Sequence, residues 1–241
     1  FSQNFSNEWE TKTLTNHRIW QTLVHPQDVN QTNMVASISN ITKVMNETKK
    51  FPELDAMMFS TIYSLRNAQK AITAETADLT ANTVLTKFDA MMDAMDEALV
   101  PVSGRVLYCD TYTKTLIDNA IAIVRNNGDK KLARNVSRIE EVDIVSVPTA
   151  LFKTEYTFND GKTSGQTDGG FVAKSTAKDI AMILLHPSAI LPIVSYSFAQ
   201  LQPPSALSQG KYVYFEESFE DVFILNKRVD AIQICVKKSA A

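Results

Sequence analysis

Apolar residues recur at the spacing of an amphipathic helix most clearly in residues 81–99. One face of that segment would collect Val84, Leu85, Phe88, Met91, Met92, Met95 and Leu99. Asp89, Asp93 and Asp96 fall elsewhere on its surface, where acidic side chains are ordinarily solvated. The pattern therefore predicts a helix that packs a methionine-rich face into a core.

Helical spacing also extends over residues 28–66, and Pro52 interrupts it. The apolar positions are Met34, Val35, Ile38, Ile41 and Met45 before the proline, and Leu54, Met57, Met58, Ile62 and Leu65 after it. A proline inside a helix removes a backbone hydrogen bond and clashes with the preceding turn. We therefore expect a long helical segment that is broken or kinked at Pro52.

Shorter apolar runs predict strands at 105–109, 142–147, 180–185, 212–215, 222–225 and 231–236. Residues 8–25 are rich in Thr and Trp and predict one or two extended strands, or a hairpin. This ribbon has few residues that could form a core of its own. Because an isolated hairpin is only marginally stable in water, the ribbon must lie against something else.

The stretch "GRVLYCDTYTKTLIDNA" predicts a strand that runs directly into a helix. Asp110 stands between them, where its carboxylate can accept the free amide hydrogens of the first helical turn. Many catalytic and nucleotide-binding units begin in this way. Yet the turn holds no glycine fingerprint, no lysine for a phosphate and no nucleophile. The sequence thus predicts a well-formed unit without chemistry at its obvious site.

The bulk composition narrows the class of protein. Of the 241 residues, 44% are hydrophobic and 21% charged, which favours a substantial core over disorder. The net charge of −3 argues against a protein that grips nucleic acid through counterion release. Cys109 and Cys235 lie in apolar strand-like runs and are expected to be buried thiols of a reducing compartment. No apolar run reaches the roughly 20 residues of a membrane span.

Motifs that would carry chemistry are incomplete. "GKTSG" at 161–165 lacks the first glycine of a phosphate-binding loop, because Tyr156 stands there. It lies in a polar loop and not between a strand and a helix, so it does not fit a nucleophile elbow either. His17, His25 and His186 have no second ligand at helical spacing, which speaks against a metal site. His25 and His186 each precede a proline, as residues at a helix start do.

The segment 125–138 carries five cations against one acid. They are Arg125, Lys130, Lys131, Arg134 and Arg138. The segment is therefore either a solvated loop or a surface that binds phosphate or an acidic neighbouring subunit.

Several segments in a fixed order carry a resemblance to the major capsid proteins of tailed bacteriophages. They are "FPELDAMMFSTIY", "VPVSGRVLYCDTYTKTLID", "RIEEVDIVSVPTALFKT", "AMILLHPSAILPIV" and "FEDVFILNKRVDAIQI". The resemblance covers about residues 20–237. None of these pieces is a catalytic motif, and their order is what makes the match specific.

The resemblance implies an α+β chain with the Hong Kong 97-type fold. Such a fold has an E-loop hairpin, a peripheral domain with a long spine helix, and an axial domain with a central mixed sheet. By position, residues 1–26 would form the E-loop segment, 27–78 and 212–241 the peripheral domain, and 79–211 the axial domain. Relative to the family pattern, we expect the N-terminal arm and about half of the E-loop to be missing from residues 1–241.

The implied function is structural and not enzymatic. Such a protein assembles with itself into hexamers and pentamers of an icosahedral shell that encloses double-stranded DNA. Portal and scaffolding or head-completion proteins are the further partners, with no cofactor, metal or membrane. The location is the virion, after assembly in the cytoplasm of a bacterial host. Two alternatives remain: an encapsulin-type compartment for a cargo enzyme, and an α/β enzyme with a site near Asp110.

Subunit contacts are expected where the chain has aromatic or charged residues without an evident core partner. The candidates are Trp9, Lys12, Arg18, Trp20, Glu216, Glu217, Lys227 and Arg228. Aromatic side chains and arginine are favoured anchors of protein interfaces. Lys227 and Arg228 lie between two predicted strands, and the acids 216–221 just before them supply the opposite sign.

Overall fold

The computed structural model describes residues 9–125, 136–167 and 169–238. The chain divides into two compact units that each draw on distant parts of the sequence. Unit 1 consists of Phe1–Ile41 and Pro192–Asp221, and unit 2 of Thr42–Leu191 and Val222–Ala241. The division into E-loop, peripheral and axial domains remains a prediction, and the two units cut across its boundaries.

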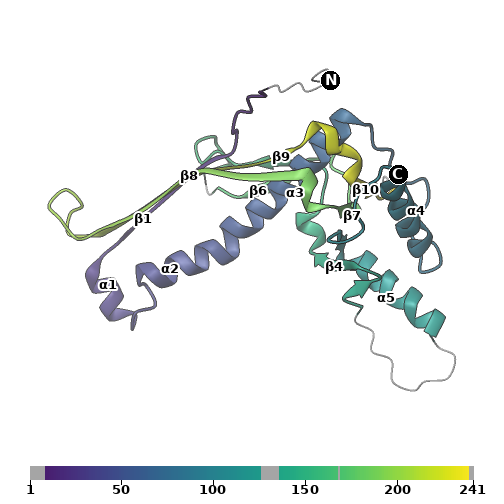
Figure 1. The fold of residues 1–241 in the computed structure, drawn as a ribbon. Coiled ribbons are helices and arrows are strands. Elements are labelled where there is room, and N and C mark those ends of the chain that lie inside the picture. The colour runs from purple at the N-terminus through teal and green to yellow at the C-terminus, as the bar shows by residue number, and fades with distance from the viewer. Residues whose placement is uncertain (1–8, 126–135, 168, 239–241) are drawn as a thin grey trace. The chain divides into compact units, whose positions relative to one another are not determined.

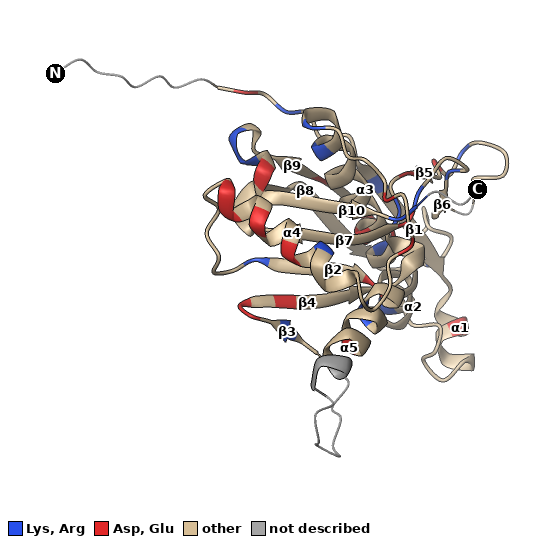
Figure 2. Cartoon of the chain, turned by 90° about the vertical axis from the view of Figure 1, so that its right-hand side faces the viewer, with Lys and Arg blue, Asp and Glu red and all other residues tan. Residues whose placement is uncertain are grey.

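Unit 2 is built on a mixed sheet of five strands in the order β10-β7-β2-β4-β3; Figure 1 labels β10, β7 and β4, and Figure 2 labels all five. β2 and β4 are parallel, and the other neighbours are antiparallel. β7 contributes six consecutive buried residues, as a strand covered on both faces does. The strands are β2 (Val106–Asp110), β3 (Arg138–Ile139), β4 (Val142–Val147), β7 (Ile180–Leu185) and β10 (Ile232–Val236).

One helix of unit 2 buries the face that the sequence predicts. α4 (Val84–Glu97) packs against α5 (Thr111–Arg125) and β10. Phe88, Met92 and Met95 of α4 join a core that includes Leu107 and Met182. The prediction of a methionine-lined core helix is therefore confirmed. Leu99, in contrast, is 91% exposed, because α4 ends at Glu97 and Leu99 itself has a φ of 56°.

The helix predicted over 28–66 consists of several pieces. They are α1 (Pro26–Gln31), α2 (Ile38–Met45), a π-helical turn (Asn46–Lys50) and α3 (Phe51–Gln69). The helical path breaks at 32–37 and continues through Pro52, so the helix is not broken at the proline. Pro52 stands in the first turn of α3, and the amide of Phe51 bonds Asn46 across the wider π turn. Pro52 has no backbone N–H to donate, and the wider π turn before it lets the helix continue without that hydrogen bond.

Smaller elements complete unit 2. β5 (Tyr156–Phe158) and β6 (Phe171–Ala173) form a separate two-stranded sheet. Three 3₁₀ turns cover Thr149–Leu151, Pro187–Ala189 and Asn226–Ala231. Phe59 of α3 places its ring 4.9 Å from that of Phe152 and 5.4 Å from that of Tyr108, which ties α3 to the central sheet.

Unit 1 holds a sheet of three strands in the order β1-β9-β8. They are β1 (His17–Val24), β8 (Ile190–Gln202) and β9 (Tyr212–Ile224), and the last two cross the boundary into unit 2. β1 pairs antiparallel with β9, from His17 opposite Phe219 to Val24 opposite Tyr212. The segment 8–25 is thus one strand with a remote partner and not a hairpin.

One prediction about the C-terminal half needs correction, and one strand there was not predicted. The runs 212–215 and 222–225 belong to one continuous strand, β9, because the acidic residues between them are paired with β1. β8 was not predicted at all, although "IVSYSF" alternates apolar and polar residues as a strand does. Pro192 near its start and the prolines at 203–204 are turn signals that hide this pattern.

Candidate assembly surface

The register of unit 1 separates its sheet into two faces, because alternate residues of a strand point to opposite sides. One face carries a row of rings, which we call the aromatic face: His17, Tyr196, Phe198, Phe215 and Phe219. The His17 ring stacks on Phe219 at 4.1 Å between centroids. Phe219 lies 6.3 Å from Tyr196, and Phe215 lies 6.1 Å from Phe198. The three strands therefore share one aromatic surface.

The aromatic face is accessible to solvent over much of its area. Tyr196 is 46% exposed and Phe198 38%, and the neighbouring Ile19 and Val194 exceed half. Scattered exposed apolar residues are ordinary, whereas a contiguous set of them marks an interaction surface. This surface is not predicted from the sequence, because no strand was expected at β8.

The opposite face holds three of the predicted interface residues. Trp20 lies directly across from Glu216, and Arg18 from Ser218. The Trp20 ring is 5.2 Å from the ring of Tyr214, whose hydroxyl donates a hydrogen bond to Glu216 at 3.0 Å. Burial and this carboxylate raise the pKa of Tyr214 to about 12. Trp20 is half-buried within its own chain, so only part of its ring is available to a neighbour.

The remaining candidates of unit 1 are spread over the N-terminal segment and the aromatic face. Glu217 accepts a bond from His17 at 2.7 Å. Lys12 forms an ion pair with Glu10 in the extended segment before β1. Trp9, in that segment, is 93% exposed. Trp9 is thus the most accessible of the predicted aromatic anchors.

Lys227 and Arg228 lie in unit 2, in the 3₁₀ turn between β9 and β10. Both side chains are exposed. The Arg228 guanidinium donates to the hydroxyl of Ser188 at 3.0 Å. The acids expected to balance them have other roles, since Asp221 accepts from the amide and hydroxyl of Thr15, each at 3.0 Å. Six of the eight predicted residues therefore belong to unit 1 and two to unit 2.

Asp110, the centre of the enzyme alternative, is fully buried and already engaged. One carboxylate oxygen accepts the amide of Thr113 at 3.1 Å, which confirms the predicted helix cap. The other oxygen lies 2.6 Å from the ammonium of Lys237. A carboxylate with both oxygens committed to structure is a poor general base, so this geometry gives the enzyme alternative no support.

The two His-Pro sites also behave as helix starts. The ring of His25 accepts a hydrogen bond from the amide of Gln27, and the ring of His186 accepts one from the amide of Ser188, each at 3.2 Å.

In the described part of the chain, no group of three or more His, Cys, Asp or Glu residues could hold a metal ion. The "GKTSG" loop is organised locally: Asp160 accepts bonds from Lys162 and Thr163, which lower its pKa to about 2.

The basic segment 125–138 mostly lies outside the described residues. Of its cations, the structure describes the side chain of Arg138, which pairs with Asp143 at 3.3 Å on the surface. Figure 2 shows where the acidic residues gather in unit 2: α4 carries Asp89, Asp93, Asp96 and Glu97 along its exposed side. Both charged features therefore face solvent as far as they are described.

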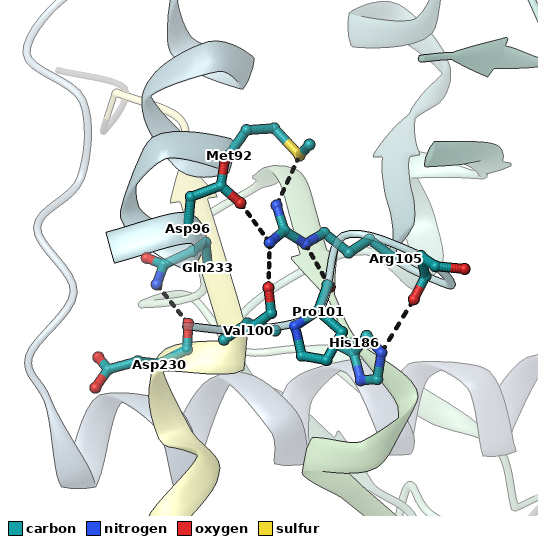
Figure 3. A network of polar contacts seen from close by, with 9 residues as sticks. Met92, Asp96, Val100, Pro101, Arg105, His186, Asp230 and Gln233 are labelled. Carbon is teal, nitrogen blue, oxygen red and sulfur yellow. Dashed lines mark hydrogen bonds and ion pairs between the residues drawn. The ribbon is translucent and has the colours of Figure 1, made fainter. Parts of the chain in front are cut away.

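An arginine that the sequence analysis did not select organises a loop of unit 2 (Figure 3). Arg105 is fully buried and donates to the carbonyls of Val100 and Pro101 at 2.6 and 2.9 Å. It also pairs with Asp96 at 2.6 Å, so that acid is not simply solvated. His186 supports the same loop, since its Nε2 lies 3.2 Å from the carbonyl of Ser103. The position of Arg105 directly before an apolar strand is the sequence signal that could have predicted a buried, structural arginine.

Comparison with known proteins gives a result at the level of structure. No family model matches the sequence, and no curated protein matches it. A chain from the mature capsid of bacteriophage PhiM1 superposes with a TM-score of 0.56 at 12% identity, covering 100% of this chain and 78% of its own. The chain has the Hong Kong 97-type fold of phage capsids.

Two further phage structures share this capsid fold. A chain from the capsid of cyanophage P-SCSP1u has a TM-score of 0.55 at 12% identity, covering 100% of this chain and 81% of its own. A chain from Mycobacterium phage Che8 has a TM-score of 0.54 at 12% identity, covering 92% and 71%. The predicted fold class, with its mixed central sheet, is confirmed. Among the described residues no helix is long and apolar enough to span a membrane.

Proposed function

We propose that this chain is a major capsid protein that assembles with itself into the hexamers and pentamers of an icosahedral phage shell around double-stranded DNA. The observation that carries the proposal is the capsid fold, shared over the whole chain with phage capsid structures. The exposed aromatic face is consistent with a protein that buries its surface against copies of itself. The net charge of −3 suits a container that must not hold its DNA tightly.

Within this proposal, contacts between subunits involve both units. Trp9, Lys12, Arg18, Trp20, Glu216 and Glu217 would act from unit 1, and Lys227 and Arg228 from unit 2. Exposed charge pairs are individually weak, but symmetry repeats each of them many times. Reversing both Lys227 and Arg228 to Glu is expected to reduce shell yield most at low salt, where screening is least.

The wider setting follows from the same proposal. The protein would be part of the virion and be assembled in the host cytoplasm, with portal and scaffolding or head-completion proteins as partners. No catalytic role is proposed. The three structures compared above all come from phages, so the alternative of a cargo compartment is not favoured.

Sedimentation and negative-stain electron microscopy of the purified chain test the proposal. Shells in the megadalton range, or ring-shaped capsomers that close into shells when salt or crowding is changed, are the expected result. A uniform monomer or small oligomer under all of these conditions, for the chain expressed with any natural upstream segment, would contradict it.

A further inference from the structure

β8 forms one edge of the unit 1 sheet, and the structure shows β9 as its neighbour on the inner side. On its outer side, no strand of the described residues pairs with it. An edge strand presents a row of backbone N–H and C=O groups that can pair with another strand. β8 is 13 residues long, and the ten that follow Pro192 would extend over roughly 33 Å. The sheet therefore offers a long open edge.

The two edges of this sheet differ in how they are protected. β1 is eight residues long and carries Arg18 beside His17. β8 contains no Lys, Arg, Asp or Glu from end to end, and Figure 2 draws it without a charged segment. Natural edge strands are normally blocked by charge, by proline, by a bulge or by short length. Of these devices β8 has one proline, Pro192, at its beginning, so most of its length is unprotected.

The side chains of β8 are also exposed on both faces of the sheet. None of its thirteen positions is buried, and eleven of them are exposed. Val194 is 63% exposed and Leu201 52%, on opposite faces. A second strand laid along this edge would cover apolar side chains on both faces while it satisfies the backbone groups. An uncharged edge selects an equally uncharged partner.

We propose that β8 pairs antiparallel with β8 of a second copy of the chain across a two-fold axis, so that two three-stranded sheets become one six-stranded sheet. Because β8 has no charged side chain, two β8 strands that pair do not place like charges opposite one another. The strand is self-complementary in this sense, as a two-fold contact requires. Both unprotected edges are covered at once, and the charged β1 strands remain as the outer edges. The inference deepens the proposed function by naming one subunit contact, and it also holds for an isolated dimer.

Single cysteines in β8 test the pairing directly. Ser195→Cys, Ser197→Cys and Ala199→Cys are made one at a time and oxidised mildly, singly and in mixed pairs. Residues opposite one another in an antiparallel pair have Cα atoms within the range a disulfide can bridge. Because Cys109 and Cys235 are buried, the unmodified chain gives little background. The matched control is Gln21→Cys, an exposed position on the other edge of the same sheet.

We expect one β8 position or one mixed β8 pair to give disulfide dimers at least about tenfold faster than Gln21→Cys. Equal rates at β8 and at Gln21 would overturn the proposal. Preferred cross-linking between Ser197→Cys and Gln21→Cys in a mixture would overturn it as well, because it would join β8 to β1 of the neighbour.

Charge substitution supplies an independent test with internal rescue. The double variant Ser195→Lys with Ser197→Lys should lose self-association at least about tenfold, and so should the corresponding double Glu variant. A mixture of the two should regain it, since opposite charges then face each other across the axis. Unchanged circular dichroism shows that the variants fold. Loss without recovery in the mixture would contradict a two-fold β8 contact.

These results can be told apart from a failure of the proposed function. Cross-linked β8 dimers in material that never forms shells would support this contact and contradict the capsid proposal. Shells that form normally without any β8 cross-link would support the capsid proposal and contradict the β8 contact.

Discussion

Arg105 fixes the loop that follows α4 in unit 2 through its side chain. Its guanidinium binds the carbonyls of Val100 and Pro101 and the carboxylate of Asp96, all between 2.6 and 2.9 Å. Just before it, Gly104 has a φ of +86°, a conformation that other residues adopt only with strain. A buried guanidinium is tolerated when its donors are satisfied in this way. The loop after α4 is therefore held from inside the core.

We predict that Arg105→Met lowers the free energy of unfolding by about 2–4 kcal/mol, because it leaves two backbone carbonyls without their charged donor. Chemical denaturation followed by circular dichroism measures this loss. Arg138→Met is the control, since Arg138 and Asp143 pair on the surface, where such pairs contribute about 0–1 kcal/mol. Equal stability of the two variants would show that the Arg105 contacts do not matter.

The two cysteines illustrate how burial, together with nearby charges, changes reactivity. Desolvation raises the pKa of Cys109 and of Cys235 to about 12. A group whose pKa is raised in the folded state binds its proton more tightly there than in the unfolded chain. Its stabilising contribution is therefore complete below the unfolded pKa near 9 and is lost as the pH rises toward about 12.

We predict that both thiols resist alkylation by iodoacetamide at pH 8 and react fully in denaturant, because only the exposed thiolate is nucleophilic. Mass spectrometry counts the modified thiols. Thermal stability should fall as the pH is raised from about 9 to 12, although tyrosines contribute in the same range. Rapid labelling of the native protein at pH 8 would mean that one of the strands opens readily.

Among the elements, α4 follows its local sequence, and the helical region before it does not. The apolar period of α4 places its buried residues as predicted, with Val84, Phe88 and Met95 essentially without exposed area. In residues 26–69 the same period is interrupted by a non-helical stretch and a π turn. Apolar spacing therefore identified inward residues of α3, such as Met57 and Ile62, but Met34 and Val35 of the same predicted pattern are 62% and 65% exposed.

We predict that Phe88→Ala costs roughly 3–5 kcal/mol, since it empties a fully enclosed site against the central sheet. The variant should be recovered mainly as insoluble protein, and its soluble part should unfold at a lower temperature. Leu99→Ala is the matched control, because that side chain is 91% exposed and its loss should change stability by no more than about 0.5 kcal/mol. A soluble Phe88→Ala protein of unchanged melting temperature would contradict the core assignment.

At the scale of the whole molecule, stability and assembly can be separated through the two tryptophans. Trp20 contacts Tyr214 within the sheet of unit 1, whereas Trp9 is 93% exposed in an extended segment. Removing a half-buried ring affects the monomer itself, and removing an exposed one does not. An exposed tryptophan in a protein that assembles is a candidate anchor for a neighbouring subunit.

We predict that Trp9→Ala leaves the unfolding curve unchanged but weakens assembly by more than about 1 kcal/mol per contact. Trp20→Ala should lower the stability of the monomer and assembly together. Thermal unfolding and analytical sedimentation of the same samples make the comparison. Normal shells from both variants would show that neither ring lies in an interface.

Local sequence determined the features that depend on neighbours a few residues apart. The helix cap at Asp110, the two His-Pro starts, the core face of α4 and the buried strand β7 could all be read in this way. Each depends on side-chain type and spacing within one or two turns, which the sequence states directly. The family resemblance rested on the order of such local pieces, and the fold it implied is the one observed.

Only the tertiary structure decided what depends on residues far apart in the chain. β1 pairs with β9, about two hundred positions away in the chain. The two strands predicted at 212–215 and 222–225 are parts of this one strand, β9. The same pairing brought Trp20 and Glu216 together and left Lys227 and Arg228 in the other unit. Arg105 and the open edge of β8 are equally non-local. Strand pairing and burial depend on which remote segments meet, and a single sequence carries no local signal for that choice.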